Sequence, residues 1–259
     1  MMSFFHGFEL RAYQTAGARL TPPVLDLGCD DGTFGAMLKE TLGSETPLFG
    51  ADVALDALQR ARRTKGSDGR RLVGASAAAL PFADGTFQVV MANAVLESIE
   101  HGLAESLDEV ARVLVPGGTF IFTVPTHRFG EYYWITRLLM RLGMPERARA
   151  YTARMDRRMT NFNCLTPERW SEMLHQAGLE VRNWVGFLPT SWVTPWSLLA
   201  WTPFRVNGFL KLIPFRPVHR AAAAAQRLLM GRIYRNTPAH TPPDACGYIL
   251  IVAGRPHAR

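Results

Sequence analysis

The stretch VLDLGCDDGTFG, residues Val24 to Gly35, decides the fold of this chain. Its apolar run carries an acid at Asp26, and a glycine-punctuated turn then leads into a helical pattern. A short buried strand, a glycine loop and a helix in this order are typical of nucleotide-binding α/β proteins, which bind their ligand at the carboxyl end of the strand. The stretch therefore predicts a ligand loop on a parallel sheet.

The glycine spacing in this loop differs from the dinucleotide pattern G-x-G-x-x-G, because Asp30 stands at the middle glycine of that pattern. Gly28 and Gly32 still allow the backbone to approach a ligand closely. The neighbouring carboxylates of Asp30 and Asp31 disfavour a pyrophosphate and favour a cation. S-adenosylmethionine is such a ligand, since it carries an ammonium and a sulfonium and no phosphate. A glycine turn with solvated acids is the alternative.

Short apolar runs alternate with helical patterns through the first half of the chain, which indicates parallel strands joined by right-handed crossovers. The expected fold is a doubly wound, Rossmann-like α/β sheet. The expected strands are Val24–Gly28, Leu48–Asp52, Arg71–Ser76, Phe87–Asn93, Thr119–Val124, Leu179–Val185 and Gly247–Gly254, and the expected helices are Glu9–Leu20, Phe34–Leu42, Ala54–Lys65, Leu103–Leu114 and one that Thr166 caps.

The helix that follows Thr166 has proline at its first position and Gly178 past its end. The sequence PGG at residues 116–118 is expected to stop the helix before it. A further short helix is expected to begin with Thr194 as N-cap and Pro195 in its first turn.

Composition bounds the class of protein. The 259 residues, 47% hydrophobic and 20% charged, suit one globular domain. Three cysteines, odd in number and far apart, form neither a disulfide framework nor a metal-binding spacing, which fits a reducing cytosol and no metal. No basic and apolar leader pattern of a secretory signal is found at the start.

The charge is divided unevenly along the chain. Residues 1–125 hold 10 Lys/Arg and 15 Asp/Glu, a balance of −5, whereas residues 126–259 hold 19 and 7, a balance of +12. A basic half suggests an anionic partner, such as a phosphorylated substrate, a membrane surface or a nucleic acid; a solvated arginine-rich surface is the alternative.

Asp52 ends the second expected strand, about twenty residues after the glycine loop, where an acid accepts hydrogen bonds from ribose hydroxyls. Nicotinamide and adenosylmethionine sites share this feature. An acid at this position can also cap the next helix.

Four motifs in order, LDLGCDDG, GADVALDALQRAR, VGASAAALPFADGTFQVVMANAVLESIEH and DEVARVLVPGGTFIFTVPTHRF, resemble the class I S-adenosylmethionine-dependent methyltransferases, specifically their type 11 domain. The resemblance covers about residues 24–128. It implies a seven-stranded sheet of order 3-2-1-4-5-7-6 with residues 247–254 antiparallel to the rest, and S-adenosylmethionine as cofactor with S-adenosylhomocysteine as product.

The resemblance also implies the cofactor-binding residues. The methionine-side loop would contain Asp26 and both loop glycines, Asp52 would hold the ribose, and Val53 would pack on the adenine. Asn93 would lie beside the methionine or the transferred methyl. The full expected set is Asp26, Gly28, Cys29, Asp30, Gly32, Asp52, Val53, Ser76, Ala77 and Asn93.

This chain departs from the family pattern at two of these motifs. Ser76 stands where relatives carry the aspartate that accepts from the adenine amine, so Ser76 and Ala77 would bind through a hydroxyl and the backbone. The common LEH reads Leu96-Glu97-Ser98 here, without the histidine often found near the reaction centre.

Methyl transfer is an in-line displacement that requires alignment, exclusion of water and, for hydroxyl or carbon nucleophiles, a base. His127, two residues past Pro125, is the best candidate for that base, with His101, Tyr132 and Tyr133 behind it. A polar loop histidine without a catalytic role is the alternative.

Two aromatic and basic insertions are left outside the sheet pattern. We expect a single methyltransferase domain over residues 1–259, with a cofactor-binding core at about 20–125 and cap insertions at about 125–165 and 186–246 that fold over the carboxyl edge of the sheet. Their candidate substrate-binding residues are Tyr132, Tyr133, Trp134, Trp192 and Trp196. Such aromatics more often serve in packing.

The sequence thus predicts an S-adenosylmethionine-dependent methyltransferase for a small-molecule or lipid-like, anionic acceptor. It also favours a cytoplasmic location with peripheral contact to the inner face of an anionic membrane. An RNA or protein methyltransferase is one alternative, although no nucleic-acid module is recognisable in the sequence. A non-catalytic relative that binds the cofactor and acts as an interaction protein is the other. The acceptor, the atom methylated and the oligomeric state stay open.

Overall fold

The computed structural model describes residues 2–63, 71–201, 242 and 245–257. Its centre is a seven-stranded sheet of order β3-β2-β1-β4-β5-β7-β6, which confirms the predicted order. Neighbouring strands are parallel from β3 to β5, and β7 is antiparallel to both of its neighbours, β5 and β6, as predicted. The strands are β1 (Val24–Leu27), β2 (Leu48–Asp52), β3 (Arg71–Gly74), β4 (Phe87–Asn93), β5 (Leu114–Pro125), β6 (Glu180–Pro189) and β7 (Cys246–Gly254).

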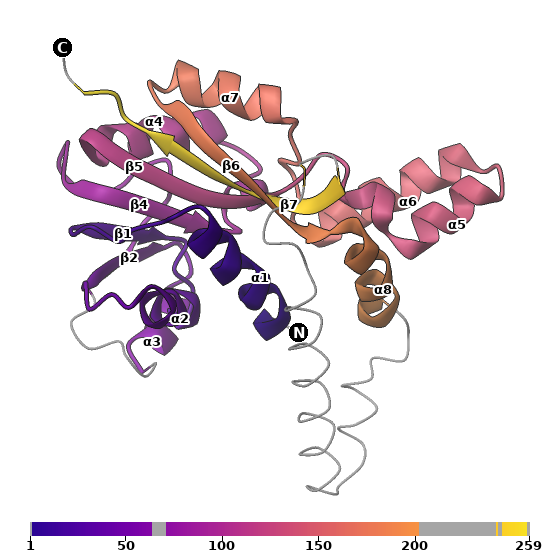
Figure 1. Ribbon diagram of the computed structural model, residues 1–259, viewed down its shortest axis with the longest axis horizontal. Coiled ribbons are helices and arrows are strands. Elements are labelled where there is room, and N and C mark those ends of the chain that lie inside the picture. Colours follow the sequence, from indigo (N-terminus) through magenta and orange to yellow (C-terminus); the bar gives the residue numbers. More distant parts are fainter. Residues whose placement is uncertain (1, 64–70, 202–241, 243–244, 258–259) are drawn as a thin grey trace, which may run out of the picture.

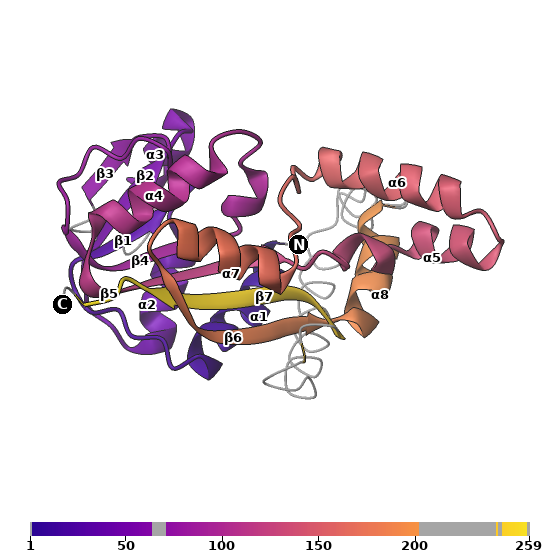
Figure 2. The same cartoon turned by 90° about the horizontal axis from the view of Figure 1, so that it is seen from above.

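Helices cover both faces of the sheet (Figures 1 and 2). They are α1 (Met2–Thr15), α2 (Thr33–Leu42), α3 (Leu55–Ala61), α4 (Leu103–Val113), α5 (Trp134–Arg141), α6 (Pro145–Arg158), α7 (Pro167–Gln176) and α8 (Thr190–Trp201), with short 3-10 turns η1 (Leu96–Ser98) and η2 (Phe129–Tyr132). Helices α1 and α2 pack on one face, and α4 and α7 pack on the other. Because helices cover both faces, the ligand site expected from the sequence has to lie at the ends of the strands.

The alternation of side chains along the strands divides the core into these two halves. In β4, Val89 and Met91 belong to the half under α1, whereas Val90 and Ala92 belong to the half under α4 and α7. Because successive side chains of a strand point to opposite faces, the next residue, Asn93, points to the α1 side.

The cap of α7 forms as predicted. Thr166 lies before the helix, and its hydroxyl accepts a hydrogen bond from the amide of Arg169 at 3.3 Å. Trp170 and Leu174 on this helix are fully buried and belong to the core on this face of the sheet.

Several expected boundaries were wrong. Helix α1 covers Met2–Thr15 instead of Glu9–Leu20. Helix α4 ends at Val113, one residue before its expected end, but residues 116–118 belong to β5, which begins at Leu114 rather than at Thr119 and shifts its register against β4 near Val89. Helix α8 begins at Thr190 rather than after Thr194, because the Thr194 hydroxyl donates to the carbonyl of Tyr132 at 2.8 Å instead of capping a helix.

The chain between β5 and α7 forms η2 and the antiparallel pair α5 and α6, and β6 runs directly into α8. Both views show α5 and α6 projecting beyond the end of the sheet where β5 finishes, with α8 beside them (Figures 1 and 2). These helices fall within the two expected cap insertions, while residues 202–241 of the second lie outside the described residues.

Candidate active site at the carboxyl edge of the sheet

The loop after β1 is built from left-handed backbone turns. Gly28 and Gly32 have φ of +68° and +73°, and Asp30 between them has φ of +43°, which side-chain-bearing residues rarely adopt. A Cβ on Gly28 would lie 2.3 Å from Cγ2 of Val95. The glycine loop and the segment after β4 are therefore in direct contact. The loop therefore needs glycine at this position for close packing as well as for its turn.

Asp52, at the end of β2, holds this loop in place. Its Oδ2 accepts from the amide of Asp30 at 2.9 Å, and its Oδ1 accepts from the amide of Ala54 at 2.8 Å. A carboxylate has about four acceptor positions, so both oxygens can still accept from a ligand. Val53, beside it, is 71% exposed, an apolar side chain open to a planar ligand.

The two neighbouring acids of this loop, Asp30 and Asp31, have different partners. Asp30 is exposed and forms an ion pair with Arg60 of α3, with 3.3 Å between Oδ1 and Nη2. Asp31 accepts from the amide of Thr33 at 3.0 Å. The pKa of Asp31 is lowered chiefly by its bonds to Thr33, with smaller contributions that include the nearby His6 of α1.

Asp26 in β1 and Cys29 in the loop that follows are buried, and a Cβ on Gly35 would lie 2.6 Å from Oδ2 of Asp26. After β3, the Ser76 hydroxyl accepts from the amide of Ala78 at 3.2 Å, and Ser76 is exposed at the same edge. Ala77 follows it, half-buried. The structure thus brings the expected cofactor residues to the carboxyl ends of β1 to β4.

Asn93, the last of that set, is bonded to a buried acid that the sequence argument missed. The hydroxyl of Thr123 on β5 lies 3.0 Å from Oδ1 of Asn93 and 3.5 Å from Oε1 of Glu9 on α1. Glu9 is only 3% exposed. Burial raises its pKa to about 7, against the opposing effect of hydrogen bonds from Asn93 and Thr123. A signal was present, since Glu9 lies four residues from both Phe5 and Tyr13, inside an aromatic helix stripe.

Glu97 is a second buried acid, on η1 just past β4. It is 4% exposed, and its Oε2 has no hydrogen-bond partner among the described residues. Burial raises its pKa to about 8, and the charge of Glu9 contributes to the same direction. Tyr248 of β7 lies close to both acids, and its own pKa is raised by burial and then by those charges.

The segment between α6 and α7, which returns from the cap, is hydrogen-bonded to η1. The carbonyl of Glu97 accepts from the amides of Phe162 at 2.7 Å and Asn163 at 3.2 Å. The Asn163 side-chain amide donates to the carbonyls of Leu96 and Ile99 at 2.8 and 2.6 Å. Glu9 of α1 and Glu97 of η1 are both buried and interact electrostatically, and they are called the buried acid pair below.

His127 is exposed after β5, and its electrostatic neighbour is Glu168 in the first turn of α7. The base role that the sequence suggests for His127 stays a prediction.

The expected substrate aromatics have several environments. Tyr133 is buried and donates to Oδ1 of Asp156 at 3.0 Å, while Trp134 and Trp192 are half-buried. The side chain of Trp196 lies outside the described residues. Tyr132 lines the pocket between η2, α5 and α6.

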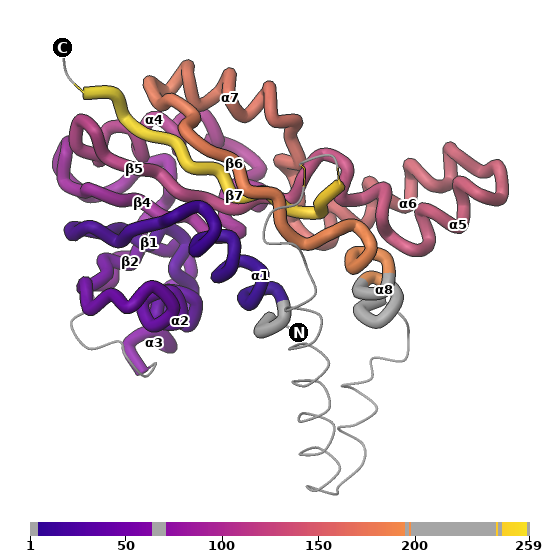
Figure 3. Tube along the Cα trace, viewed as in Figure 1, coloured from indigo at the N-terminus to yellow at the C-terminus, as the bar shows by residue number. Residues whose placement is uncertain are grey.

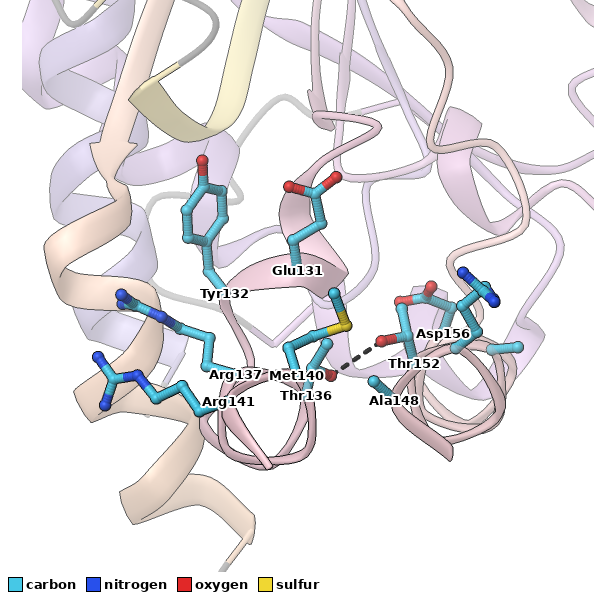
Figure 4. A pocket seen from close by; sticks show the side chains of 11 residues that line it. Glu131, Tyr132, Thr136, Arg137, Met140, Arg141, Ala148, Thr152 and Asp156 are labelled. Atoms are coloured by element: carbon cyan, nitrogen blue, oxygen red, sulfur yellow. Dashed lines mark hydrogen bonds between the residues drawn. The ribbon is translucent and has the colours of Figure 1, made fainter. Parts of the chain in front are cut away.

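That pocket has a volume of about 720 Å³ and mixed lining (Figure 4). Arg137 and Arg141 leave α5 on the same side in this view, and Thr136 and Thr152 join the two helices through a 2.8 Å hydrogen bond. Its lining residues are Glu131, Tyr132, Thr136, Arg137, Met140, Arg141, Ala148, Arg149, Thr152, Ala153 and Asp156.

Within the part of the chain that the structure describes, no three His, Cys, Asp or Glu side chains are grouped so that they could hold a metal ion. No helix there combines the length and apolar character needed to cross a membrane.

Known proteins similar to this chain share both its motifs and its fold. A family model described as a methyltransferase domain matches residues 25–122. A demethylmenaquinone methyltransferase of Thermus thermophilus is 31% identical over 193 residues, which are 66% of this chain and 80% of that protein. A fatty-acid O-methyltransferase of Mycolicibacterium smegmatis is 33% identical over 111 residues, which are 43% of this chain and only 40% of that enzyme.

Solved structures agree at the level of the fold. A geranyl diphosphate methyltransferase in complex with S-adenosylmethionine superposes with a TM-score of 0.56 at 17% identity, covering 94% of this chain and 85% of that one. YcgJ of Bacillus subtilis superposes with a TM-score of 0.55 at 16% identity, covering 98% and 100%. The chain belongs to the class I S-adenosylmethionine-dependent methyltransferase family, because it has the family motifs in order, the strand order of the sheet and an extended match to one relative.

Proposed function

We propose that this protein transfers a methyl group from S-adenosylmethionine to a small, lipid-like acceptor. The observation that carries this proposal is the bond network joining Asn93, on the expected cofactor side, to the buried carboxyl of Glu9. The names of the relatives support the acceptor class, since they specify demethylmenaquinone and fatty acid as substrates of those enzymes.

The residues present fit the cofactor. Asp52 offers both carboxylate oxygens to a ribose, and exposed Val53 offers an apolar surface to an adenine. Asp26 and Asp31 give the loop a negative charge, which suits an ammonium and a sulfonium. Asp30 already pairs with Arg60, so we assign it to holding α3 against the loop rather than to ligand contact. When bound, the cofactor supplies an electrophilic methyl group.

The buried acid pair supplies a proton acceptor for the acceptor's nucleophile. With the cofactor bound, the ionised carboxyl of Glu9 or Glu97 would take up the proton that the acceptor's nucleophile loses. Carboxyls with pKa values of about 7 and about 8 are poised near neutral pH, where a general base is most effective. His127 is the competing candidate, and its exposure leaves the nucleophile less shielded from water.

The cap provides the space for the acceptor. The pocket beside Tyr132 combines apolar Met140 with Arg137, Arg141 and Arg149, a lining that suits a bulky apolar molecule with negative charge. Tyr133, Trp134, Trp192 and Trp196 are retained as proposed substrate-binding residues. We place the protein in the cytoplasm, at the inner face of the membrane where such acceptors reside.

Calorimetry tests the cofactor part of this proposal. Both S-adenosylmethionine and S-adenosylhomocysteine should bind. Asp52→Ala should weaken binding by at least about 100-fold, since it removes two hydrogen bonds to a charged group, each worth about 1.5–3 kcal/mol. Asp56→Ala, which removes an exposed carboxylate four residues away, is the matched control and should change little. Absence of binding by either form of the cofactor refutes the proposal.

Radiolabelled methyl transfer tests the acceptor class. Protein and labelled cofactor added to a lysate of the native host should place the label in the fraction extracted by organic solvent. Label confined to RNA or protein would refute a lipid-like acceptor. In the same assay, Glu97→Gln should lower the rate more than His127→Ala if the acid pair is the base.

A further inference from the structure

The segment after Trp134 carries an unusual concentration of exposed apolar side chains. Leu138, Met140, Leu142 and Met144 are 44%, 54%, 59% and 38% exposed, and they are four of the seven large exposed apolar residues in the described part of the chain. All four lie within seven consecutive residues, at the end of α5 and in its turn to α6. Exposed apolar residues gathered in this way mark an interaction site.

Positive charge surrounds this apolar segment. Residues 137–158 contain seven arginines and two acids, a balance of +5. All seven arginines are exposed. Of the two acids, Glu146 pairs with Arg149, and Asp156 is half-buried beside the Tyr133 hydroxyl. The surface that remains is basic and apolar together.

The position of this hairpin in the fold leaves that surface accessible. Helices α5 and α6 pack on each other and on η2, and α5 also meets α8. Both views show the pair standing out from the end of the sheet, with the turn between α5 and α6 at its far tip (Figures 1 and 2).

We propose that the α5–α6 hairpin, residues 134–158, docks on the surface of an anionic lipid bilayer. The leucine and methionine side chains at the tip enter the boundary between headgroups and acyl chains, and the arginines bind the lipid phosphates. Arginine stems add apolar contact while their charged ends stay at the headgroups.

Two other occupants fit this surface less well. A second copy of the hairpin would bring two surfaces of +5 together, and like charges repel. A single-stranded nucleic acid would use the arginines but requires aromatic platforms for its bases, whereas the exposed residues at the tip are aliphatic.

Docking would also place the 720 Å³ pocket at the membrane, because Met140, Arg141 and Arg149 of the hairpin line it. In this respect the inference rests on the proposed function, since it explains how an acceptor dissolved in a bilayer reaches the enzyme. The docking itself requires neither cofactor nor acceptor, so its test is independent of methyl transfer.

Co-sedimentation with vesicles tests the docking. The full chain should bind vesicles of phosphatidylcholine with about a third phosphatidylglycerol, bind pure phosphatidylcholine far less, and lose affinity as salt is raised. The triple variant Arg147→Gln, Arg154→Gln, Arg157→Gln should bind the anionic vesicles about 100-fold more weakly, because each surface arginine contributes about fivefold.

The matched control removes the same charge elsewhere. Arg19→Gln, Arg62→Gln, Arg63→Gln lowers the net charge equally but lies outside the hairpin, and it should retain most of the binding. The double variant Leu138→Ser, Leu142→Ser should weaken binding at high salt as well as at low salt. All of these positions are exposed, so circular dichroism should show unchanged folding.

Hydrogen exchange locates the contact. Amides of residues 138–150 should gain protection on anionic vesicles. The proposal is overturned if the chain does not bind anionic vesicles, if the control triple variant loses binding as strongly as the hairpin triple variant, or if the hairpin variants abolish RNA binding in gel shifts and leave vesicle binding intact.

Discussion

Replacing Glu97 by glutamine should remove a pH-dependent loss of stability. The side chain is buried, and its pKa in the folded protein is about 8 against an ordinary value of 4.5, so the folded state holds a proton that the unfolded state releases. For an acid with a raised pKa, stability is fully present below about pH 4.5 and is lost as the pH rises to about 8. Glutamine keeps the shape and does not titrate.

The expected magnitude follows from that shift. A difference of 3.5 pH units between 4.5 and 8 corresponds to about 5 kcal/mol in total, of which about 4 kcal/mol falls between pH 5 and pH 9. Glu97→Gln should therefore unfold at a similar urea concentration to the natural protein at pH 5, and at a clearly higher one at pH 9.

Urea unfolding followed by circular dichroism from pH 5 to pH 9 measures this difference, since the midpoint reports the free energy of unfolding at constant m-value. Glu105→Gln, a substitution of an exposed acid on α4, is the control and should leave the pH profile unchanged. A profile of Glu97→Gln parallel to that of the natural protein would show that Glu97 is ionised or solvated in the folded state, and would refute the buried acid pair.

Other substitutions test the loop and the network beside it. Gly28→Ala should lower the free energy of unfolding, measured with heat or urea, by about 3 kcal/mol, because it strains the left-handed backbone and clashes with Val95. Adding Val95→Ala should recover only the part of this loss that is due to the clash. Arg60→Ala breaks an exposed ion pair with Asp30, so the free energy of unfolding should fall by less than about 1 kcal/mol. The affinity for the cofactor should change little. A large loss of affinity would show that Asp30 contacts the ligand. Thr123→Val should lower kcat more than it changes KM for the cofactor, because it removes the hydroxyl that joins the acid network; equal loss of stability and activity would indicate a structural role only.

The strands of the sheet were predictable because their signals are local. Both β2 and β4 are short apolar runs that end in a polar residue, and both match their expected bounds at both ends. Asp52 was identifiable for the same reason, since a ribose-binding acid is recognised by its distance along the chain from the glycine loop.

The boundaries that failed depend on tertiary contacts. Residues 116–118 read as a stop signal, yet Gly117 is accommodated in β5 at φ of +83° while its amide donates to the carbonyl of Arg255. Thr194 reads as a cap, yet its hydroxyl binds a carbonyl of η2. In both cases a partner more than 60 residues away in the sequence decides the outcome.

The acid pair could not be identified from spacing, because its members come from distant elements. Glu9 precedes the glycine loop and Glu97 follows β4, and no motif joins them. The fold alone brings their charges within electrostatic reach of each other, and residues 162 and 163 of the returning chain bind the backbone of η1.

The bridging position of β7 has a consequence for the synthesis of this protein. Figure 3 shows β7 lying between β5 and β6, although it follows both in the sequence. Until residues 246–254 leave the ribosome, β5 has an unpaired apolar edge and β6 has no neighbour in the sheet. The nascent chain therefore carries an open sheet edge through the emergence of more than a hundred residues, from Pro125 to Cys246, and is exposed to aggregation for that time. We expect translation of this protein to depend on chaperones that shield strand edges.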